Sequence, residues 1–404
     1  MHRLKNILQT KNKIVIKIGT NLIADKVNGI NTDRISNIAQ SVLYLHSLGN
    51  HVAIVSSGAI GAGVAALGLK ERPKTIPGKQ ATAAIGQPIL MKAYDNAFKK
   101  RRRMFVFIKH LFQLKLKEAY KYVFTKQEYA IAQILLTKDD FVNRARYVNA
   151  KNTFSTLFKQ GIIPIINEND TVAIEEIKLG DNDNLSALVA NLIEADLLII
   201  LSDIDGLFSD DPAKNHDAEL IPVVEKITPQ IEKLAKSSKT ELSTGGMVTK
   251  IQAAKRCVSA GIAMIIANGK NTNILKEIFS GNFKGTLFLP EENKLNVRKK
   301  WIGFVSHSKG FIVVDDGAKC ALLKKQKSLL PSGILEVHGE FKANDTISVR
   351  GIDNNEIAKG VTGYSSLDIE IIKGKKTGEI EKILNRKSCD EVIHRDNLVL
   401  IGEE

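Results

Sequence analysis

IIPIINENDTVAIEEIKLGDNDNLSALVANLIEADLLIILSD, residues 162–203, contains two short apolar runs separated by a polar stretch and a helical pattern. The runs 162–167 and 196–203 are rich in isoleucine and leucine, which is typical of strands buried on both faces of a sheet. Between them, residues 182–195 place apolar side chains at helical spacing. A strand, a helix and a second strand in this order predict a parallel sheet covered by helices.

The same alternation fills the first 290 residues. Residues 32–49 carry apolar side chains at helical spacing, and Thr32 and Gly49 are suited to begin and end that helix. Residues 245–261 predict another helix. Further buried-strand runs are KIVIKIG (13–19), HVAIVSS (51–57), YAIAQILLT (129–137) and GIAMIIANG (261–269). We therefore expect an α/β domain over residues 1–290, with a mainly parallel sheet sandwiched by helices.

The sequence changes in character near residue 290. Residues 291–300, EENKLNVRKK, are polar and charged, as linkers between domains commonly are. The chain beyond them has short strand-like runs separated by Gly, Asn and Asp. These runs are FIVVDD (311–316), GILEVHG (333–339), DTISVRG (345–351) and EIAKGVTGY (356–364). We expect a second domain over residues 301–404, built as a small β-barrel.

The positive charge of the chain is concentrated in one segment. The formal net charge is +14, from 58 Lys and Arg against 44 Asp and Glu. Residues 101–126 hold eight Lys and Arg and one Glu, which is half of that excess. Residues 301–404 hold 15 basic and 16 acidic residues. Because nucleic-acid affinity comes largely from basic residues at phosphates, the balance of the C-terminal part does not favour RNA binding.

Composition also bears on where the protein works. No apolar run approaches the ~18 residues of a transmembrane helix. The stretch 1–13 lacks the apolar segment of a secretory signal. Cys257, Cys320 and Cys389 are far apart, which argues against a disulfide framework and a zinc site. We expect a cytoplasmic protein with no membrane association.

Polar or glycine-rich stretches follow the predicted strands, at the edge where ligands bind in open parallel sheets. SSGAIGAG (56–63) and TGGMVTK (244–250) both lead into predicted helices, whose N-terminal N–H groups can hold a phosphate. Each could also be a purely structural turn. Neither fits the Walker pattern G-x-x-x-x-G-K-[ST] or the dinucleotide pattern G-x-G-x-x-G. Together these stretches predict one cleft.

Two lysines and three aspartates carry the charge at this edge. Lys17 interrupts an apolar strand, where an ammonium group is costly unless it reaches a partner or solvent. Lys250 lies in the first turns of a predicted helix and could be a surface lysine. Asp170, Asp181 and Asp183 could bind a substrate ammonium, orient the lysines, or face Mg²⁺ carried by a nucleotide. A solvated acidic loop is the alternative.

Several of these stretches resemble one family. They are KIVIKIGTNLI (13–23), VSSGAIGAG (55–63), PIINENDTVA (164–173), IKLGDNDNLSA (177–187), LSDIDGLF (201–208) and TGGMVTK (244–250). In this order they resemble the glutamate 5-kinases, a branch of the amino acid kinase family. GDNDN and TGGMVTK are specific to that branch. Residues 301–404 resemble the PUA module found at the C-terminus of those enzymes. The resemblance covers nearly the whole chain.

The resemblance implies a reaction and its ligands. It implies the amino acid kinase fold and phosphorylation of the L-glutamate γ-carboxylate by ATP, giving γ-glutamyl phosphate in the first step of proline biosynthesis. Mg²⁺ would arrive with the nucleotide, so no separate metal site is expected. L-proline is implied as a feedback inhibitor, and a homo-oligomer is expected. RNA binding by the PUA-like domain is possible but not favoured.

The resemblance also implies residue roles. Catalysis is assigned to Lys17, Asp183 and Lys250. L-glutamate binding is assigned to Ser57, Asp170 and Asn182. Nucleotide binding is assigned to Lys17, Ser202, Asp203 and the run Thr244, Gly245, Gly246, Met247, Val248, Thr249 and Lys250.

Two alternatives and one departure remain. Another amino acid kinase, acting on aspartate, acetylglutamate or UMP, would lack the PUA-like tail and the GDNDN stretch. An RNA-binding protein on a degenerate kinase scaffold would be expected to lose catalytic positions, and none is lost here. The departure is residues 101–126, which lengthen a helix–strand connection that is short in the family. We expect a helical insertion that lies away from the active site.

Overall fold

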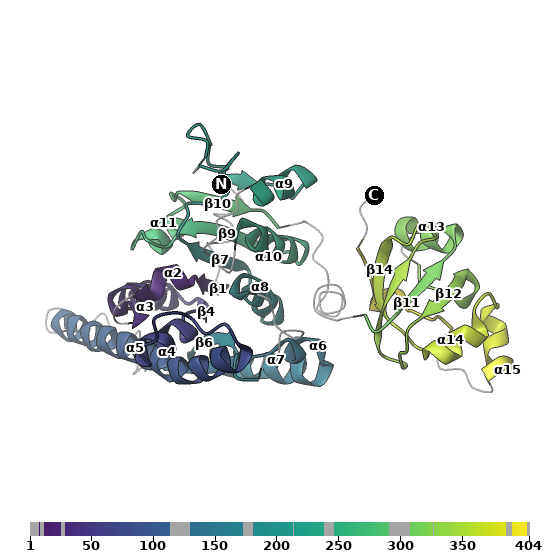
Figure 1. The fold of residues 1–404 in the computed structure, drawn as a ribbon, viewed down its shortest axis with the longest axis horizontal. Helices are drawn as coiled ribbons and strands as arrows, with labels where there is room; N and C mark the ends of the chain where they lie inside the picture. The colour runs from purple at the N-terminus through teal and green to yellow at the C-terminus, as the bar shows by residue number, and fades with distance from the viewer. Residues whose placement is uncertain are drawn as a thin grey trace. The chain divides into compact units, whose positions relative to one another are not determined.

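The computed structural model describes the chain in ten stretches. They are residue 8 and residues 12–25, 29–113, 130–172, 181–212, 214–237, 246–290, 308–325, 327–384 and 390–401. The chain divides into two compact units, the first within residues 1–294 and the second made mainly of residues 295–404 (Figure 1). The division falls within the predicted linker 291–300, which lies outside the described residues.

The first unit is built on an eight-stranded sheet of described strands in the order β5-β6-β4-β1-β7-β9-β10-β8. The six strands from β5 to β9 are parallel, and β10 runs antiparallel to β9. The mainly parallel sheet predicted from the sequence is confirmed. The strands are β1 (Lys13–Ile18), β4 (His51–Ser56), β5 (Ile131–Leu136), β6 (Ile163–Glu168), β7 (Leu197–Ser202), β8 (Val223–Val224), β9 (Ala263–Asn268) and β10 (Gly285–Phe288).

Helices cover both faces of this sheet (Figure 1). On one face, α3 (Thr32–Ser47), α5 (Ile76–Gln113) and α11 (Ile274–Ser280) share a hydrophobic core with alternate residues of β1 and β4. On the other, α8 (Asn182–Leu192) and α10 (Met247–Ser259) pack together and against β1, β7 and β9. The remaining elements are α2 (Thr20–Ile23), β2 (Ala24–Asp25), β3 (Gly29–Ile30), α4 (Ala59–Ala66), α6 (Lys138–Val142), α7 (Arg144–Lys159) and α9 (Pro229–Ser237).

The central strands are apolar because helices cover both faces of the sheet. Ile14, Val15 and Ile16 are completely buried although successive side chains point to opposite faces. Burying an isoleucine or valine side chain contributes about 1.5–3 kcal/mol, so these strands hold the layers together. Of the five buried residues of β1, Lys17 is the charged one, near the end of the strand where the functional groups gather.

The start of α3 corrects one sequence prediction. Thr32 is the first helical residue, and the side chain of Asn31 caps the helix by accepting a hydrogen bond from the Arg34 N–H. Asn is as good an N-cap as Thr, so sequence alone did not separate the two positions. Gly49 follows the helix with φ of 88°, a conformation that favours glycine, as predicted.

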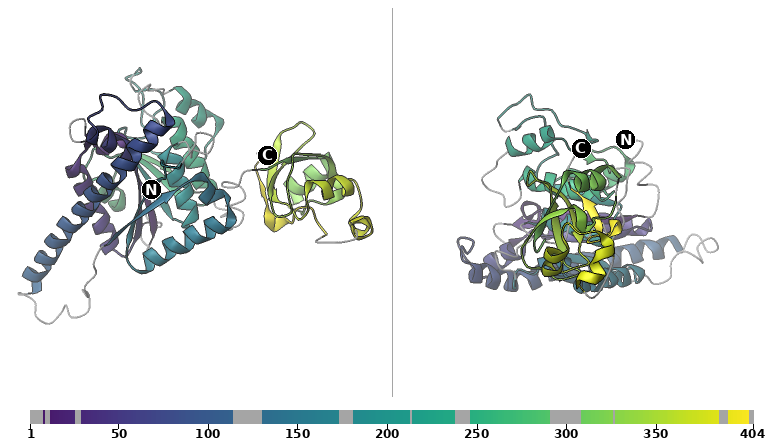
Figure 2. Two further views of the ribbon diagram at one scale, coloured as in Figure 1. Left: turned by 60° about the horizontal axis from the view of Figure 1, so that its bottom comes forward. Right: turned by 90° about the vertical axis from the view of Figure 1, so that its right-hand side faces the viewer.

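Part of the predicted insertion continues a helix. α5 runs without interruption from Ile76 to Gln113, which includes the first half of residues 101–126. The end of α5 projects from the layered core (Figure 2). Residues 114–129 lie outside the described part of the chain. None of the described helices combines the length and the apolar character that a membrane span requires.

The second unit is a five-stranded mixed sheet of described strands in the order β12-β11-β13-β14-β15. Its four predicted strand runs are confirmed, and β15 and the helices went unpredicted. The strands are β11 (Phe311–Val314), β12 (Ile334–His338), β13 (Thr346–Arg350), β14 (Glu356–Val361) and β15 (Leu398–Leu400). The helices are α13 (Asp316–Lys325), α14 (Ser366–Ile372) and α15 (Ile380–Leu384), with short 3₁₀ turns η2 (Pro331–Gly333), η3 (Thr377–Glu379) and η4 (Arg395–Asn397). The unit has a hydrophobic core of its own.

Candidate active site

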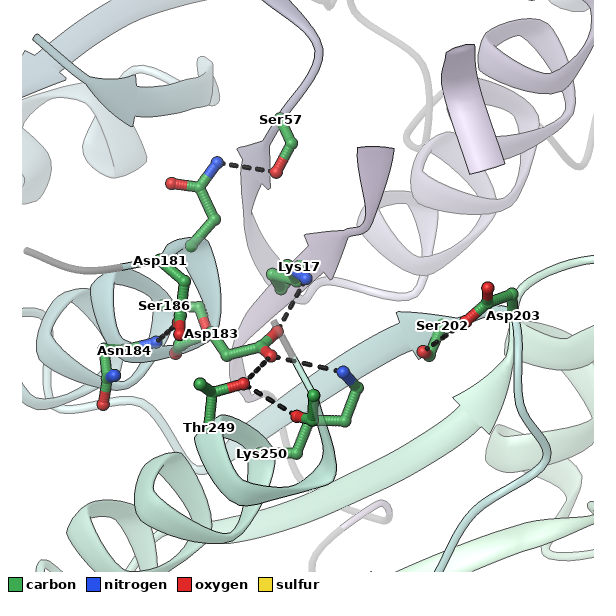
Figure 3. Close-up of polar contacts among 12 residues, drawn as sticks. Lys17, Ser57, Asp181, Asp183, Asn184, Ser186, Ser202, Asp203, Thr249 and Lys250 are labelled. Atoms are coloured by element: carbon green, nitrogen blue, oxygen red, sulfur yellow. Dashed lines mark hydrogen bonds and ion pairs between the residues drawn. The ribbon is translucent and has the colours of Figure 1, made fainter. Parts of the chain in front are cut away.

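Four neighbouring strands end at the same edge of the first sheet. β6, β4, β1 and β7 are adjacent and parallel, so their carboxyl ends point the same way. The helices α8 and α10 begin beside this edge, as Figure 3 shows. Parallel strands therefore bring distant parts of the chain together. The predicted residues placed here are Lys17 in β1, Ser57 after β4, Asp170 after β6 and Asp203 after β7.

Lys17, Asp183 and Lys250 form a buried ion cluster (Figure 3). Lys17 Nζ lies 2.6 Å from Asp183 Oδ1, and Lys250 Nζ lies 3.3 Å from Asp183 Oδ2. Asp183 has 0% of its surface exposed, and Lys17 and Lys250 have 8% and 4%. Ions this deeply buried require partners of opposite charge. Asp183 is the partner of both lysines. Two ammonium groups and one carboxylate leave the cluster with a positive charge, so it favours an anion.

The two lysines keep Asp183 ionised. Burial raises the pKa of the Asp183 carboxyl because it disfavours the charged form. The charges of Lys17 and Lys250, with hydrogen bonds from Lys17 and Thr249, outweigh that effect and hold the pKa below its ordinary value. At neutral pH Asp183 is therefore a carboxylate that fixes the positions of two ammonium groups.

The first turn of α10 adds a hydroxyl and an open helix end. The Thr249 hydroxyl lies 2.9 Å from Asp183 Oδ2 and 2.8 Å from the Gly246 carbonyl oxygen, either of which can accept its proton. Gly246 is the N-cap of α10, and no atom of the described residues lies within 4 Å of the position that a Cβ there would take. The backbone at this helix N-terminus is therefore accessible to an anion, close to Lys250.

Asp181 begins α8 and so positions Asp183. Its Oδ1 accepts a hydrogen bond from the Asn184 N–H at 2.9 Å, which is the N-cap arrangement. Burial, followed by the charge of Asp183, raises the pKa of Asp181. Asp183 lies in the first helical turn, where the helix dipole favours a carboxylate. The structure gives Asp181 a capping role, which was not among those considered from the sequence.

Side-chain amides connect Ser57 to α5. Asn182 Nδ2 donates hydrogen bonds to Ser57 Oγ at 2.7 Å and to Asn167 Oδ1 at 3.1 Å. Asn167 Nδ2 in turn donates to Gln87 Oε1 at 3.0 Å. Asn167 and Gln87 are buried. This amide chain orients Asn182 toward Ser57, two residues that the sequence assigned to the same ligand.

Gln87 and Asn167 received no role from the sequence. Gln87 Nε2 is buried and has no hydrogen-bond partner in the described part of the chain, so it is a donor available to the site. The position of Asn167 at the end of a predicted strand and the polar Gln87 within AIGQ (84–87) were the available signals. Neither signal identified the partner, because the two residues are 80 positions apart.

Ser202 and Asp203 extend the polar edge at the end of β7 (Figure 3). Asp203 accepts hydrogen bonds from Ser202 Oγ at 3.2 Å and from Asn21 Nδ2 at 3.0 Å. Burial raises the pKa of Asp203, but these hydrogen bonds lower it overall. Asp203 is exposed, whereas Ser202 is buried. The pair can therefore present a fixed carboxylate to a ligand.

Apart from Ser202 and Asp203, the predicted site residues divide into three groups. Lys17, Asp183, Thr249 and Lys250 make direct contacts around one carboxylate, and Ser57 contacts Asn182. Asp170 is half-buried just beyond β6, and Gly246, Met247 and Val248 begin α10. The predicted nucleotide-binding residues Thr244 and Gly245 lie outside the described residues.

Sequence comparison agrees with this architecture. The model of the amino acid kinase family matches residues 12–268, and that of the PUA domain matches residues 310–384. The chain belongs to the amino acid kinase family. The resemblance inferred from the sequence motifs is thereby confirmed, for both parts of the chain.

Similar curated proteins include glutamate 5-kinases from several organisms. The one from Caldanaerobacter subterraneus subsp. tengcongensis is 46% identical over 389 residues, covering 96% of this chain and 98% of that protein. The one from Geobacter sulfurreducens is 47% identical over 395 residues, covering 98% and 99%. Among solved structures, carbamate kinase from Giardia lamblia has a TM-score of 0.47 at 18% identity, covering 70% of this chain and 99% of that one.

Proposed function

We propose that this chain has glutamate 5-kinase activity, the transfer of the γ-phosphoryl group of ATP to the γ-carboxylate of L-glutamate. The full-length likeness to glutamate 5-kinases supports the reaction. The observation that carries the site assignment is the buried cluster of two lysines on Asp183 beside the open N-terminus of α10. It offers positive charge and backbone donors to the phosphates of the nucleotide.

The chemistry requires no general base. The γ-carboxylate of glutamate is already ionised at neutral pH, because the ordinary pKa of Glu is about 4.3. One of its oxygens attacks the γ-phosphorus as the bond to the ADP oxygen breaks. Catalysis then consists of aligning two anions and stabilising negative charge on the transferring group. Lys17 and Lys250 supply that stabilisation, and Asp183 holds both ammonium groups in place.

The nucleotide and its Mg²⁺ require donors of different kinds. Lys17, Lys250 and the start of α10 would hold the phosphates, with Thr244 and Gly245 completing the loop. Ser202 and Asp203 would contact the rest of the nucleotide. In the described part of the chain, no group of three His, Cys, Asp or Glu side chains is placed to hold a metal ion. Mg²⁺ would be bound through the phosphates and would add positive charge there.

Ser57, Asn182 and Asp170 are assigned to L-glutamate. Ser57 and Asn182 are in contact and offer a hydroxyl and an amide, which suit a carboxylate. Asp170 is the half-buried carboxylate that follows β6 and suits the α-ammonium group. Substrate binding at the ends of β4 and β6 would place the γ-carboxylate near the lysine cluster.

The proposal also covers the pathway, the regulation, the location and the oligomeric state of the enzyme. The product, γ-glutamyl phosphate, is an acyl phosphate that enters proline biosynthesis, and L-proline would inhibit the enzyme as the end product. We assign the enzyme to the cytoplasm and expect a homo-oligomer.

The test is a substrate panel. ADP release is measured with L-glutamate, D-glutamate, L-aspartate and N-acetyl-L-glutamate, each with and without L-proline, and hydroxylamine traps the acyl phosphate as a hydroxamate. We expect turnover and hydroxamate with L-glutamate, reduced by L-proline. Faster turnover with N-acetyl-L-glutamate or L-aspartate would reject the substrate assignment and retain the kinase fold.

A further inference from the structure

The second unit contains a surface pocket that the proposed reaction does not use. Its volume is about 310 Å³, near the lower limit for small-molecule sites. The polar residues lining it are Ser308, Lys309, Ser348, Arg350, Glu356 and Lys359. Three of these residues are basic and one is acidic, although residues 301–404 as a whole have 15 basic and 16 acidic residues.

Strand register gathers these side chains on one face of the second sheet. Phe311 of β11 and Lys359 of β14 both pair with Ser348 of β13, so the three form a row across the strands. Arg350 lies two residues further along β13 and pairs with Glu356 of β14 after a bulge. Residues two apart in a strand share a face. The pocket is therefore part of the sheet itself.

Polar atoms in this pocket are buried without hydrogen-bond partners. Ser348 is 3% exposed, and its Oγ has no partner. The same holds for Ser308 Oγ and Arg350 Nε among the described residues. A buried donor without a partner costs about 1–3 kcal/mol, so it is unusual to find three around one pocket. All three can donate to a ligand oxygen.

Arg350 is held in place by neighbours that leave Nε available. Its guanidinium carbon lies 4.0 Å from the centre of the Phe311 ring, and Nη1 donates to Asn354 Oδ1 at 3.0 Å. His338 stacks on the same Phe311 ring at 4.4 Å between centres. Because Phe311 already contacts both groups, it does not offer the open aromatic face on which single-stranded nucleic acids stack their bases.

The charges of the pocket favour a compact anion. Lys309 is paired with Asp345, with Nζ 2.8 Å from Oδ1. No ion pair among the described residues involves Arg350 or Lys359. Glu356 offsets one of these charges, and one positive charge remains. Two of the unpaired donors belong to β13 and one to Ser308, just before β11. Three donors suit the several oxygens of a phosphoryl group better than the two of a carboxylate.

We propose that this pocket binds a phosphoryl group, as inorganic phosphate or as the phosphate ester of a small molecule. Ser308, Ser348 and Arg350 donate hydrogen bonds to its oxygens, and Lys359 contributes charge. The site is separate from the kinase site, since all its residues belong to the second unit. RNA fits less well, because the pocket is small, contains Glu356 and has no free stacking face.

The test is calorimetric titration of the full chain with its kinase site saturated by Mg²⁺ and ADP. Inorganic phosphate and AMP are titrated separately, which distinguishes free phosphate from a phosphate ester. We expect one additional site, whose affinity falls about tenfold or more in Lys359→Gln and in Ser348→Ala. The matched control is Lys375→Gln, which removes an exposed lysine of the same unit outside the pocket.

Kinase activity and thermal unfolding of each variant establish that it is folded, and activity should stay within about twofold of the wild type. The proposal is overturned if the wild type binds neither probe, or if Lys359→Gln binds phosphate as tightly as the wild type. It is also overturned if a single-stranded RNA octamer binds this unit and phosphate does not compete with it.

Discussion

At the residue scale, Asp183 has the largest effect on the site because two buried ammonium groups share its carboxylate. Replacing it by Asn leaves Lys17 and Lys250 uncompensated and free to shift. We expect Asp183→Asn to lower the rate of phosphoryl transfer about 10²–10³-fold, comparable to removing one preorganised charge-stabilising donor. Steady-state ADP release measures this, and unchanged activity would reject the proposed role of Asp183.

The same substitution predicts a pH dependence of stability. The folded-state pKa of Asp183 lies below its ordinary value of about 3.9. Its ionised form therefore stabilises the fold fully above pH ~3.9, and the contribution is lost as pH falls through the folded-state pKa. We expect the difference in urea-unfolding free energy between wild type and Asp183→Asn to be largest at pH 7. The difference should become smaller as the pH falls below ~3.9. A difference that widens on acidification would contradict this linkage.

Gln87 provides a second prediction at this scale. Gln87→Leu removes the acceptor of the Asn167 amide, and Asn167 in turn orients Asn182. The loss of one buried hydrogen bond corresponds to a change of about tenfold in binding affinity. We therefore expect the KM for L-glutamate to rise about tenfold, while kcat and the KM for ATP change little. The matched control is Gln160→Leu, at an exposed residue just after α7. An equal rise in the two KM values would indicate general loss of structure instead.

At the scale of elements, α8 and α10 bring charges to the ends of strands. α8 begins with a capped turn that contains Asp183, and α10 begins at Met247, after the N-cap Gly246, and carries Lys250 in its first turn. Both helix N-termini lie at the carboxyl ends of parallel strands, where an anion gains from helix dipole and lysine together.

The long helix α5 gives the element-scale prediction. Residues 101–126 join a helix to the amino-terminal end of β5, whereas the candidate site lies at the carboxyl ends of the strands. The core residues of α5 among the described side chains, including Tyr94 and Phe98, precede Arg101. A deletion that joins Lys100 to Gln127 should fold and keep both KM values within about twofold, since such connections need only ~2–6 residues. A soluble, folded deletion that loses affinity for L-glutamate would place the insertion at the site.

At the scale of the whole molecule, each unit has a separate hydrophobic core. The first is centred on residues such as Ile16 and Ile199, and the second on residues such as Ile312 and Val349. Since every proposed catalytic residue precedes Ile251, we expect a chain of residues 1–290 to fold and to keep L-glutamate-dependent ATP turnover. Circular dichroism and ADP release measure this. A well-folded 1–290 chain without activity would show that the second unit is required for catalysis.

The sequence by itself determined the strands and their order of appearance. Buried runs such as KIVIKIG and DLLIILSD have a composition that only a doubly covered strand accommodates, and all six predicted strands before residue 270 form where expected. Helix starts were less certain, as Asn31 shows, because several neighbouring residue types can cap. Local sequence specifies the type of an element more strongly than its boundary.

Resemblance to a family supplied the roles of Lys17, Asp183 and Lys250, but only the tertiary structure decided their contacts. Lys17 and Asp183 are 166 positions apart, and no local rule gives the 2.6 Å between Nζ and Oδ1. Gln87 meets Asn167, and Ser348 meets Lys359, through packing and strand register. Periodicity depends on neighbours in the chain, and therefore shows in the sequence. Burial and pairing depend on which distant elements pack together, and are fixed only when the sheet and its helices assemble.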